Sequence, residues 1–456
     1  MVSPDNPFVG HTRGPVVLGV VLDRVDLRGV GDIAAGLPRP KPVSEGSVAA
    51  VREIVEAVRA DGDAALARYT KQFDGDVPPT WRVPPAEVAA ARDHVDPVLL
   101  AALEAAAESI AEFHRGQASK EQTHTRQGIT IRSWDQPVGR AGCYVPGGRA
   151  AYPSTVLMTA LPAAAAGVDQ VVLCVPPGPD GLVADVTLAA AAIAGVDEVY
   201  AVGGAQAVAA MAYGTESIGA VDVIVGPGNV YVAIAKQLVA GVVGVPAAFA
   251  GPSEVVVVAD GTAPAEYAAI DLIVQAEHGP DGLAWFITWD PDTADAVEKA
   301  VASLLSGADR RDDIAATFSR SGYIVLVDGP EAAVEVVNFI APEHLQVMTE
   351  APEAVIDRVR NAGAIFRGPL APASIGDYVA GPSHVLPTNG TARFAGALGV
   401  RDFVKPMHEI AVDSEGLAAL GPHVAAIADA EGLDAHAQSI RLRGVAESVQ
   451  RGTDDE

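Results

Sequence analysis

The chain has 456 residues, with 58 acidic and 31 basic side chains and a formal net charge of −27. This length is sufficient for two to four domains with buried cores. So negative a surface repels phosphate groups, which argues against nucleic acid or an anionic membrane as a partner. Two cysteines, Cys143 and Cys174, are too few for a disulfide framework, and their apolar surroundings indicate small buried side chains rather than redox groups. The sequence contains no convincing signal peptide or membrane span, so we expect a soluble cytoplasmic protein.

The first half of the chain passes from helical to alternating patterns. Apolar residues recur at helical spacing between 47 and 117, in SVAAVREIVEAVRADGD and DPVLLAALEAAAESIAEFHRG. The strand-like segments GITIRSW and VGRAGCYVPGG follow. From residue 152, Ala-rich helical segments alternate with the short strands QVVLCVPP, EVYAVGG and VDVIVGPG. Such alternation is typical of βαβ units and a parallel sheet.

A second alternating block begins at SEVVVVAD (253–260) and runs through LAWFITWD and YIVLVDG to AIFRG. The sequence therefore predicts an α/β protein with two Rossmann-like parallel-sheet domains and small N-terminal and C-terminal helical extensions.

The expected domain division follows these blocks. Residues 1–38 form an N-terminal arm, and residues 39–143 with 252–398 form one discontinuous α/β domain that carries the metal and catalytic residues. Residues 144–251 form a second α/β domain with the dinucleotide-contacting turns, and residues 399–456 form a C-terminal tail. That tail is too short to bury a good core alone, so it should dock on something larger.

Three Gly-rich turns follow strand-like runs in the first alternating block: YVPGG (144–148), VGGAQA (202–207) and VGPGNVY (225–231). Turns at strand ends are where α/β sheets bind ligands. The usual G-x-G-x-x-G pattern is absent, so a dinucleotide site and ordinary βα turns both remain open.

Two pairs of polar residues interrupt apolar segments. Gln275 and His278 are three positions apart on an expected helix, so they share a face and could meet one metal ion. A polar helix end is the alternative. Glu343 and His344 can both move protons near neutral pH, the carboxylate once burial has raised its pKa, although an element cap would explain the same pair.

Further candidates lie in the Gly-rich segment SIGDYVAGPSH and near the last helix. Asp377 sits between glycines that let the backbone approach a ligand, although a turn-forming role would also explain it. His384 shares this segment. Glu431 and His436 flank the start of the last expected helix, where the positive end of the helix dipole favours neutral imidazole, the form that binds metals. A surface histidine is the alternative.

Taken together, several motifs resemble the histidinol dehydrogenase family, in the same order along the chain. The resemblance covers about residues 22–445, and the first twenty or so residues look like an extension. It is carried by GCYVPGGRAAYPSTVLM, GGAQAVAAMAYGT, GPGNVYV, AGPSEV, QAEH, APEHLQV, GDYVAGPSHVLPTNGTARF and EGLDAHAQSIRLR.

The resemblance implies oxidation of L-histidinol to L-histidine through the bound aldehyde, with reduction of two NAD+. It also implies one zinc ion per subunit, bound by Gln275, His278, Asp377 and His436, and Glu343 and His344 as the acid–base pair. Substrate contacts fall at Ser253, His384 and Glu431, together with His344 and the four metal ligands, and NAD contacts fall at Tyr144, Gln206 and Asn229. The implied protein is a homodimer in which each site borrows His436, with Glu431, from the partner. On this interpretation zinc orients the substrate, His344 takes the alcohol proton and Glu343 activates water.

Two other functions fit parts of the pattern. A zinc hydrolase of the amidase type would use Glu343 to activate a metal-bound water, but it would need none of the three Gly-rich turns. A non-catalytic metal or solute carrier would leave Glu343 and His344 without a role.

Overall fold

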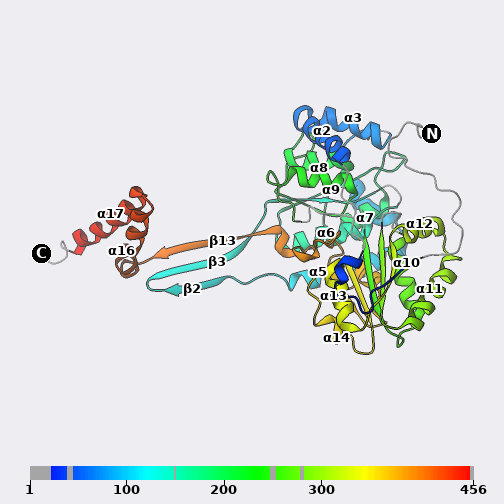
Figure 1. Cartoon of the computed structure of the whole chain (residues 1–456). Helices are drawn as coiled ribbons and strands as arrows, with labels where there is room; N and C mark the ends of the chain where they lie inside the picture. Colours follow the sequence, from blue (N-terminus) through cyan, green and yellow to red (C-terminus); the bar gives the residue numbers. More distant parts are fainter. Residues whose placement is uncertain are drawn as a thin grey trace.

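The computed structural model describes residues 22–37, 45–75, 77–147, 150–246, 253–277 and 282–451. Two parallel sheets with helices on both faces form the body, and a long antiparallel arm leaves it and ends in two helices (Figure 1). The predicted fold class is confirmed.

Sheet A is wholly parallel and has the strand order β1-β10-β9-β8-β11-β12. Its strands are β1 (Asp23–Asp26), β8 (Glu254–Ala259), β9 (Leu283–Thr288), β10 (Gly322–Leu326), β11 (His344–Met348) and β12 (Ala364–Arg367). Every residue of β8 is buried, because both faces of the sheet are covered. Val255 and Val257 face one core, whereas Val256 and Val258 face the other.

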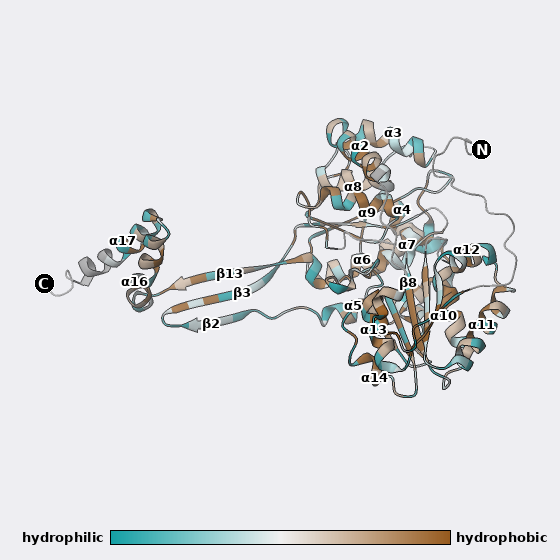
Figure 2. Ribbon diagram, in the orientation of Figure 1, coloured by the Kyte–Doolittle hydropathy of each residue, from teal (hydrophilic) through white to brown (hydrophobic). Residues whose placement is uncertain are grey.

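Helices cover both faces of sheet A, and Figure 2 shows the hydrophobic strands lying between them. One face packs against α10 (Ala265–Ala276), α11 (Pro291–Leu305) and α12 (Arg311–Ser321). The other face packs against α1 (Ile33–Gly36), α13 (Pro330–Ile340) and α14 (Glu353–Ile356).

Sheet B is also parallel and has the order β6-β5-β4-β7. Its strands are β4 (Arg140–Tyr144), β5 (Gln170–Val175), β6 (Glu198–Ala201) and β7 (Val223–Val225). One face packs against α2 (Glu45–Asp61), α3 (Asp63–Phe73), α8 (Gly204–Tyr213) and α9 (Val230–Val239). The other packs against α4 (Pro85–Ala90), η1 (Ala91–His94), α5 (Pro97–Arg115), α6 (Pro153–Ala166) and α7 (Asp185–Ile193).

The arm consists of three antiparallel strands in the order β13-β3-β2. They are β2 (Gln122–Arg126), β3 (Ile129–Pro137) and β13 (Val404–Val412), and the β2–β3 hairpin turns at Gln127 and Gly128, both with positive φ. At the tip lie α16 (Ser414–Ala430) and α17 (Asp434–Arg451), far from the two sheets (Figure 1). Between sheet A and the arm run three short helices, α15 (Ala373–Tyr378), η2 (Thr391–Arg393) and η3 (Val400–Phe403).

The packing differs in two respects from the expected domain division. Residues 39–143 were assigned to the domain that carries Glu343, but α2 and α3 contact α8 and α9, and α5 contacts α6. Strand β4 likewise belongs to sheet B, whereas β1, from the expected N-terminal arm, extends sheet A. Helical periodicity shows that a helix has an apolar face, but it does not show which sheet that face covers.

Candidate active site

Glu343 and His344 lie at the amino end of β11, beside the amino end of β8. Both side chains are buried. Oε2 of Glu343 accepts a hydrogen bond from the backbone N–H of Glu254 (2.9 Å), and Nδ1 of His344 lies 3.3 Å from the backbone oxygen of Glu254. Because that carbonyl can only accept, Nδ1 carries a proton and donates it. The backbone N–H and carbonyl of one residue thus hold both side chains.

His344 also lies between two carboxylates. Its Nδ1 is 3.6 Å from Oε2 of Glu343, and its Nε2 is 3.4 Å from Oδ1 of Asp377. Its ring stacks on Phe366 at 5.9 Å between ring centres. Burial lowers the pKa of His344, but the negative charges of Glu343 and Asp377 outweigh this effect and raise it to about 9.

Asp377, on α15, connects this cluster to sheet B. Nδ1 of His384 lies 2.9 Å from the backbone oxygen of Asp377, and Nε2 of His384 lies 3.2 Å from Oγ1 of Thr155. Thr155 is in the first turn of α6, which directly follows β4. Ser383 adds a second connection, since its hydroxyl donates to the backbone oxygen of Met158. The site therefore lies where the amino edge of sheet A approaches the start of α6.

Gln275 lies in the last turn of α10, which ends at Ala276. Gln275 is buried, and its Nε2 atom has no hydrogen-bond partner, so this amide nitrogen can donate to a ligand, whereas a metal ion would bind the amide oxygen. His278 lies outside the described residues. Ser253 immediately precedes β8 and is half-buried, and its carbonyl accepts from the Leu283 N–H (3.1 Å).

Glu431 and His436 are exposed and belong to the end of α16 and the start of α17, which lie at the tip of the arm, far from the two sheets of the same chain (Figure 1). In the described ranges, no three His, Cys, Asp or Glu side chains gather closely enough to hold a metal ion. A single chain therefore brings together Glu343, His344, Asp377 and His384, but not His436.

The three Gly-rich turns follow β4, β6 and β7 at the carboxyl edge of sheet B. From β4 the chain adds β5 and then β6 on one side of β4. It then crosses back and adds β7 on the other side, so the strand order reverses between β4 and β7. Such a reversal is the usual ligand crevice of an α/β sheet. Gly226 (φ 102°) packs so closely on the backbone of Tyr144 that a side chain there would clash.

Each NAD candidate has a definite place at this edge. Gln206, in the first turn of α8, is buried with both amide atoms unpartnered. Asn229 is exposed and caps α9 by accepting from the N–H groups of Tyr231 and Val232. Tyr144 is buried, and its hydroxyl accepts from the N–H of Gly204, so it supports the start of α8.

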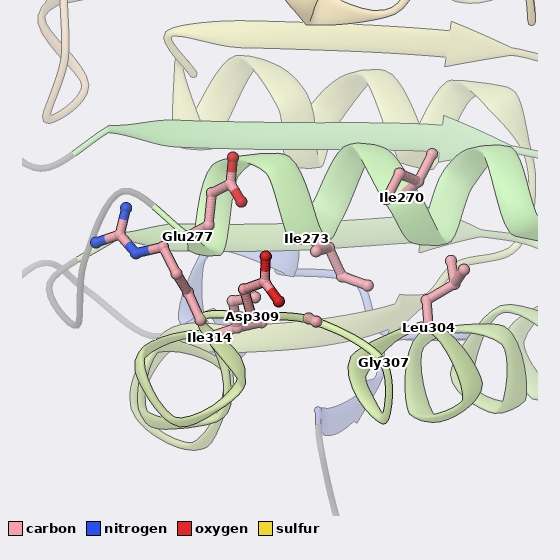
Figure 3. Close-up of a pocket in the computed structure, with 9 residues that line it drawn as sticks. Ile270, Ile273, Glu277, Leu304, Gly307, Asp309 and Ile314 are labelled. Carbon is pink, nitrogen blue, oxygen red and sulfur yellow. The ribbon is translucent and has the colours of Figure 1, made fainter. Parts of the chain in front are cut away.

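A surface hollow of about 420 Å³ lies on the other side of α10 (Figure 3). Ile270, Ile273 and Glu277 line it from α10, and the segment 304–310 lines it from α11 and the chain that follows. Gln275 projects from the opposite face of the helix to Ile273, since two positions correspond to about 200° of rotation. This hollow is therefore separate from the candidate site.

Comparison with known proteins identifies the family. Residues 37–444 match the family model described as histidinol dehydrogenase. The chain belongs to the histidinol dehydrogenase family. The histidinol dehydrogenase of Rhizobium meliloti (strain 1021) is 47% identical over 429 residues, which are 93% of this chain and 98% of that protein. That of a Synechococcus species is 48% identical over 398 residues, or 87% of this chain and 92% of that protein.

A crystal structure of histidinol dehydrogenase from Elizabethkingia anophelis has the same architecture. It matches with a TM-score of 0.89 at 34% identity, covering 95% of this chain and 99% of that one. The resemblance inferred from the motifs is confirmed, and the chain is an oxidoreductase that oxidises histidinol in histidine biosynthesis. This assignment argues against the hydrolase and the carrier. In the described part of the chain, no helix has the length and apolarity needed to cross a membrane.

Glu254 was not singled out in the sequence. It follows Ser253 in AGPSEV and precedes a run of consecutive valines, so the pattern predicts only that it is the first residue of a strand. Only the pairing of β8 with β11 shows that its backbone holds both Glu343 and His344.

Proposed function

We propose that the site oxidises L-histidinol to L-histidine in two successive steps, with one zinc ion and two NAD+, and keeps the aldehyde bound between them. The observation that carries this proposal is the position of His344, which contacts a buried carboxylate through one nitrogen and Asp377 through the other. The cytoplasmic location expected from the sequence stays a prediction.

The described donor groups suit zinc, which accepts nitrogen and oxygen ligands. Gln275 presents a buried amide whose oxygen could bind the ion, and Asp377 presents a half-buried carboxylate beside an imidazole. These two residues, His278 and His436 of the partner subunit would hold the ion. When bound, zinc would orient the imidazole and amino nitrogens of the substrate. Ser253, His384 and Glu431 of the partner subunit would complete the substrate contacts.

The carboxyl edge of sheet B suits a dinucleotide. The strand order reverses between β4 and β7, and both amide atoms of Gln206 are buried and available at this edge. Asn229 caps α9, whose amino end favours a negative group. Two NAD+ molecules, bound there in turn, would supply the two-electron oxidant for the alcohol and for the hydrated aldehyde. Tyr144 would support this edge from beneath, through its bond to Gly204.

Glu343 and His344 can supply the two proton transfers. The carbonyl of Glu254 fixes one proton of His344 on Nδ1, so Nε2 is the atom that would accept a proton once the ring is neutral. A zinc ion held by Asp377 would offset the charge of that carboxylate, which is one cause of the raised pKa of His344, and would favour the neutral ring. His344 would take the proton of the alcohol through Nε2. Glu343, held by the Glu254 N–H, would take a proton from the water that adds to the aldehyde. Because both groups are buried, the reactive aldehyde is shielded from bulk water.

A second copy of the chain would complete the site. The arm exposes large apolar side chains, including Ile410 on β13, Ile427 on α16 and Leu442 on α17. Apolar side chains are also exposed on and near α15, at Leu370 and Tyr378. A twofold dimer in which each arm lies over the partner's site would cover both surfaces and bring His436 of the partner subunit to Asp377.

The test is the stoichiometry of NADH formation with limiting histidinol and zinc-loaded protein. The proposal expects two NADH per histidinol consumed and recovery of histidine. A stoichiometry of one, or release of free aldehyde as the main product, would contradict it.

A further inference from the structure

Glu254 is a buried acid beside the catalytic pair. It is 3% exposed and opens β8 at the amino edge of sheet A. His344 pairs with Val255 in the β8–β11 register, so Glu254 stands next to Glu343 on the neighbouring strand. Paired residues of parallel strands project on the same side of the sheet, and two carboxyl groups therefore share one buried region.

The backbone of Glu254 orients both catalytic side chains. Its N–H donates to Oε2 of Glu343 and its carbonyl accepts from Nδ1 of His344. A small shift of the backbone at Glu254 would move the base that activates water and the base that takes the alcohol proton. What holds this backbone in place therefore affects both proton transfers.

The side chain of Glu254 holds this backbone in place through a separate contact. Its Oε1 accepts from the N–H of Asn389, a non-glycine residue with φ of 56° that precedes η2. A left-handed residue of this kind persists only where its surroundings hold it. The Glu254 carboxyl thus ties β8 to the 388–391 turn.

Three charged or titratable groups act on this carboxyl. Glu343 and His344 face it from the start of β11, and Arg393 acts from η2. Arg393 donates to the carbonyls of Gly390 (2.7 Å) and Phe339. Burial, together with the charge of Glu343, raises the pKa of Glu254 to about 8, despite the opposing effects of Asn389, Arg393 and His344.

We propose that Glu254 is a positioning residue of the catalytic pair and that it acts as a neutral carboxylic acid. A second carboxylate beside Glu343 would repel it and favour protonation of Glu343, which would remove the base that activates water. A neutral acid keeps the hydrogen bond to Asn389 without that charge. The inference rests on the proposed roles of Glu343 and His344.

Infrared spectroscopy tests the protonation state without relying on activity. At pH 7 the wild-type protein should show a buried carboxylic-acid C=O band that shifts in D2O and is lost in Glu254→Gln. Asp271→Asn is the matched control, because burial raises the pKa of Asp271 only to about 6 and it is mostly ionised at pH 7. The band should persist in that variant. A spectrum unchanged by Glu254→Gln would overturn the neutral acid.

Kinetics of three variants test the positioning role. Glu254→Gln keeps the length and neutrality of the side chain, Glu254→Asp keeps an acid but is shorter, and Glu254→Ala removes the link to Asn389. We expect kcat/KM of Glu254→Gln to exceed that of the other two by at least about tenfold in both half-reactions. A kcat/KM of Glu254→Asp equal to or higher than that of Glu254→Gln would overturn the proposal. If Glu343→Gln were fully active while the infrared band behaved as expected, the proposed function would be wrong and the neutral Glu254 would stand.

Discussion

Nε2 of His344 lies 3.4 Å from Oδ1 of Asp377, although one residue begins β11 and the other lies on α15. The residue proposed to accept the alcohol proton therefore touches a residue proposed to bind zinc. The contact places proton transfer and substrate orientation within one side-chain length of each other. It also makes the position of α15 a determinant of the reaction.

Replacing Asp377 should weaken zinc binding. Asp377→Asn keeps the shape of the side chain but removes its negative charge. Changing residues that only support metal ligands already costs about 10–100-fold in affinity, so loss of a ligand charge should cost no less than about tenfold. Competition with a chromophoric chelator measures this. Asp169→Asn, at an exposed position before β5, is the control, and equal zinc affinity in the two variants would count against the ligand assignment.

Replacing Glu343 should affect the two oxidations unequally. Glu343→Gln removes the base proposed for water activation but leaves His344 to take the alcohol proton. General acid–base groups contribute about 10²–10⁴-fold, so oxidation of the aldehyde should fall by that range and oxidation of the alcohol by much less. Single-turnover assays started from histidinol and from histidinal separate the steps. Equal losses in both would refute this division of roles.

Mixed dimers test whether His436 acts on the partner. Glu343→Gln and His436→Ala are each expected to form almost no histidine as homodimers, so histidine formation is the activity measured. After joint unfolding and refolding in equal amounts, random pairing makes about half the dimers mixed, and each mixed dimer has one intact site. Activity should then return to roughly one quarter of wild type. If activity stays at the level of the separate variants, the tail serves its own subunit.

The raised pKa of Glu254 predicts how stability depends on pH. The ordinary value of 4.5 rises to about 8 in the folded protein, so between these values the folded state keeps a proton that the unfolded state has released. The stabilisation that the protonated side chain gives to the folded state is fully present below the ordinary pKa value, and it is lost as pH rises through about 8. Glu254→Gln lacks it, so the urea midpoint of the variant should rise relative to wild type from pH 5 to pH 8.

Asp271→Asn provides the comparison for this experiment. The pKa of Asp271 rises from 3.8 only to about 6. The urea midpoint of Asp271→Asn should therefore rise relative to that of wild type up to about pH 6, and the difference between the two midpoints should stay constant at higher pH. If the urea midpoints of both variants rose equally relative to wild type up to pH 8, the effect would belong to another group.

The sequence by itself determined the family, the two α/β blocks and most of the residues that meet at the site. Long motifs such as APEHLQV and GDYVAGPSHVLPTNG are specific, and alternating Val-rich and Ala-rich segments predict buried parallel strands under helices. Local patterns of this kind survive in the fold because each depends on neighbours along the chain.

Tertiary structure alone decided which edge of each sheet is used. The strand order of sheet A reverses between β8 and β11, and the general rule would place a ligand at their carboxyl ends. Glu254, Glu343 and His344 lie at the opposite, amino ends. Packing and strand pairing also placed α2, α3, α5 and β4 with sheet B, and they made the Glu254 backbone a support for both proposed catalytic residues. Contacts between residues about ninety positions apart, such as Glu254 and Glu343, leave no periodic pattern in the sequence, because they depend on register across a sheet and not on spacing along a strand.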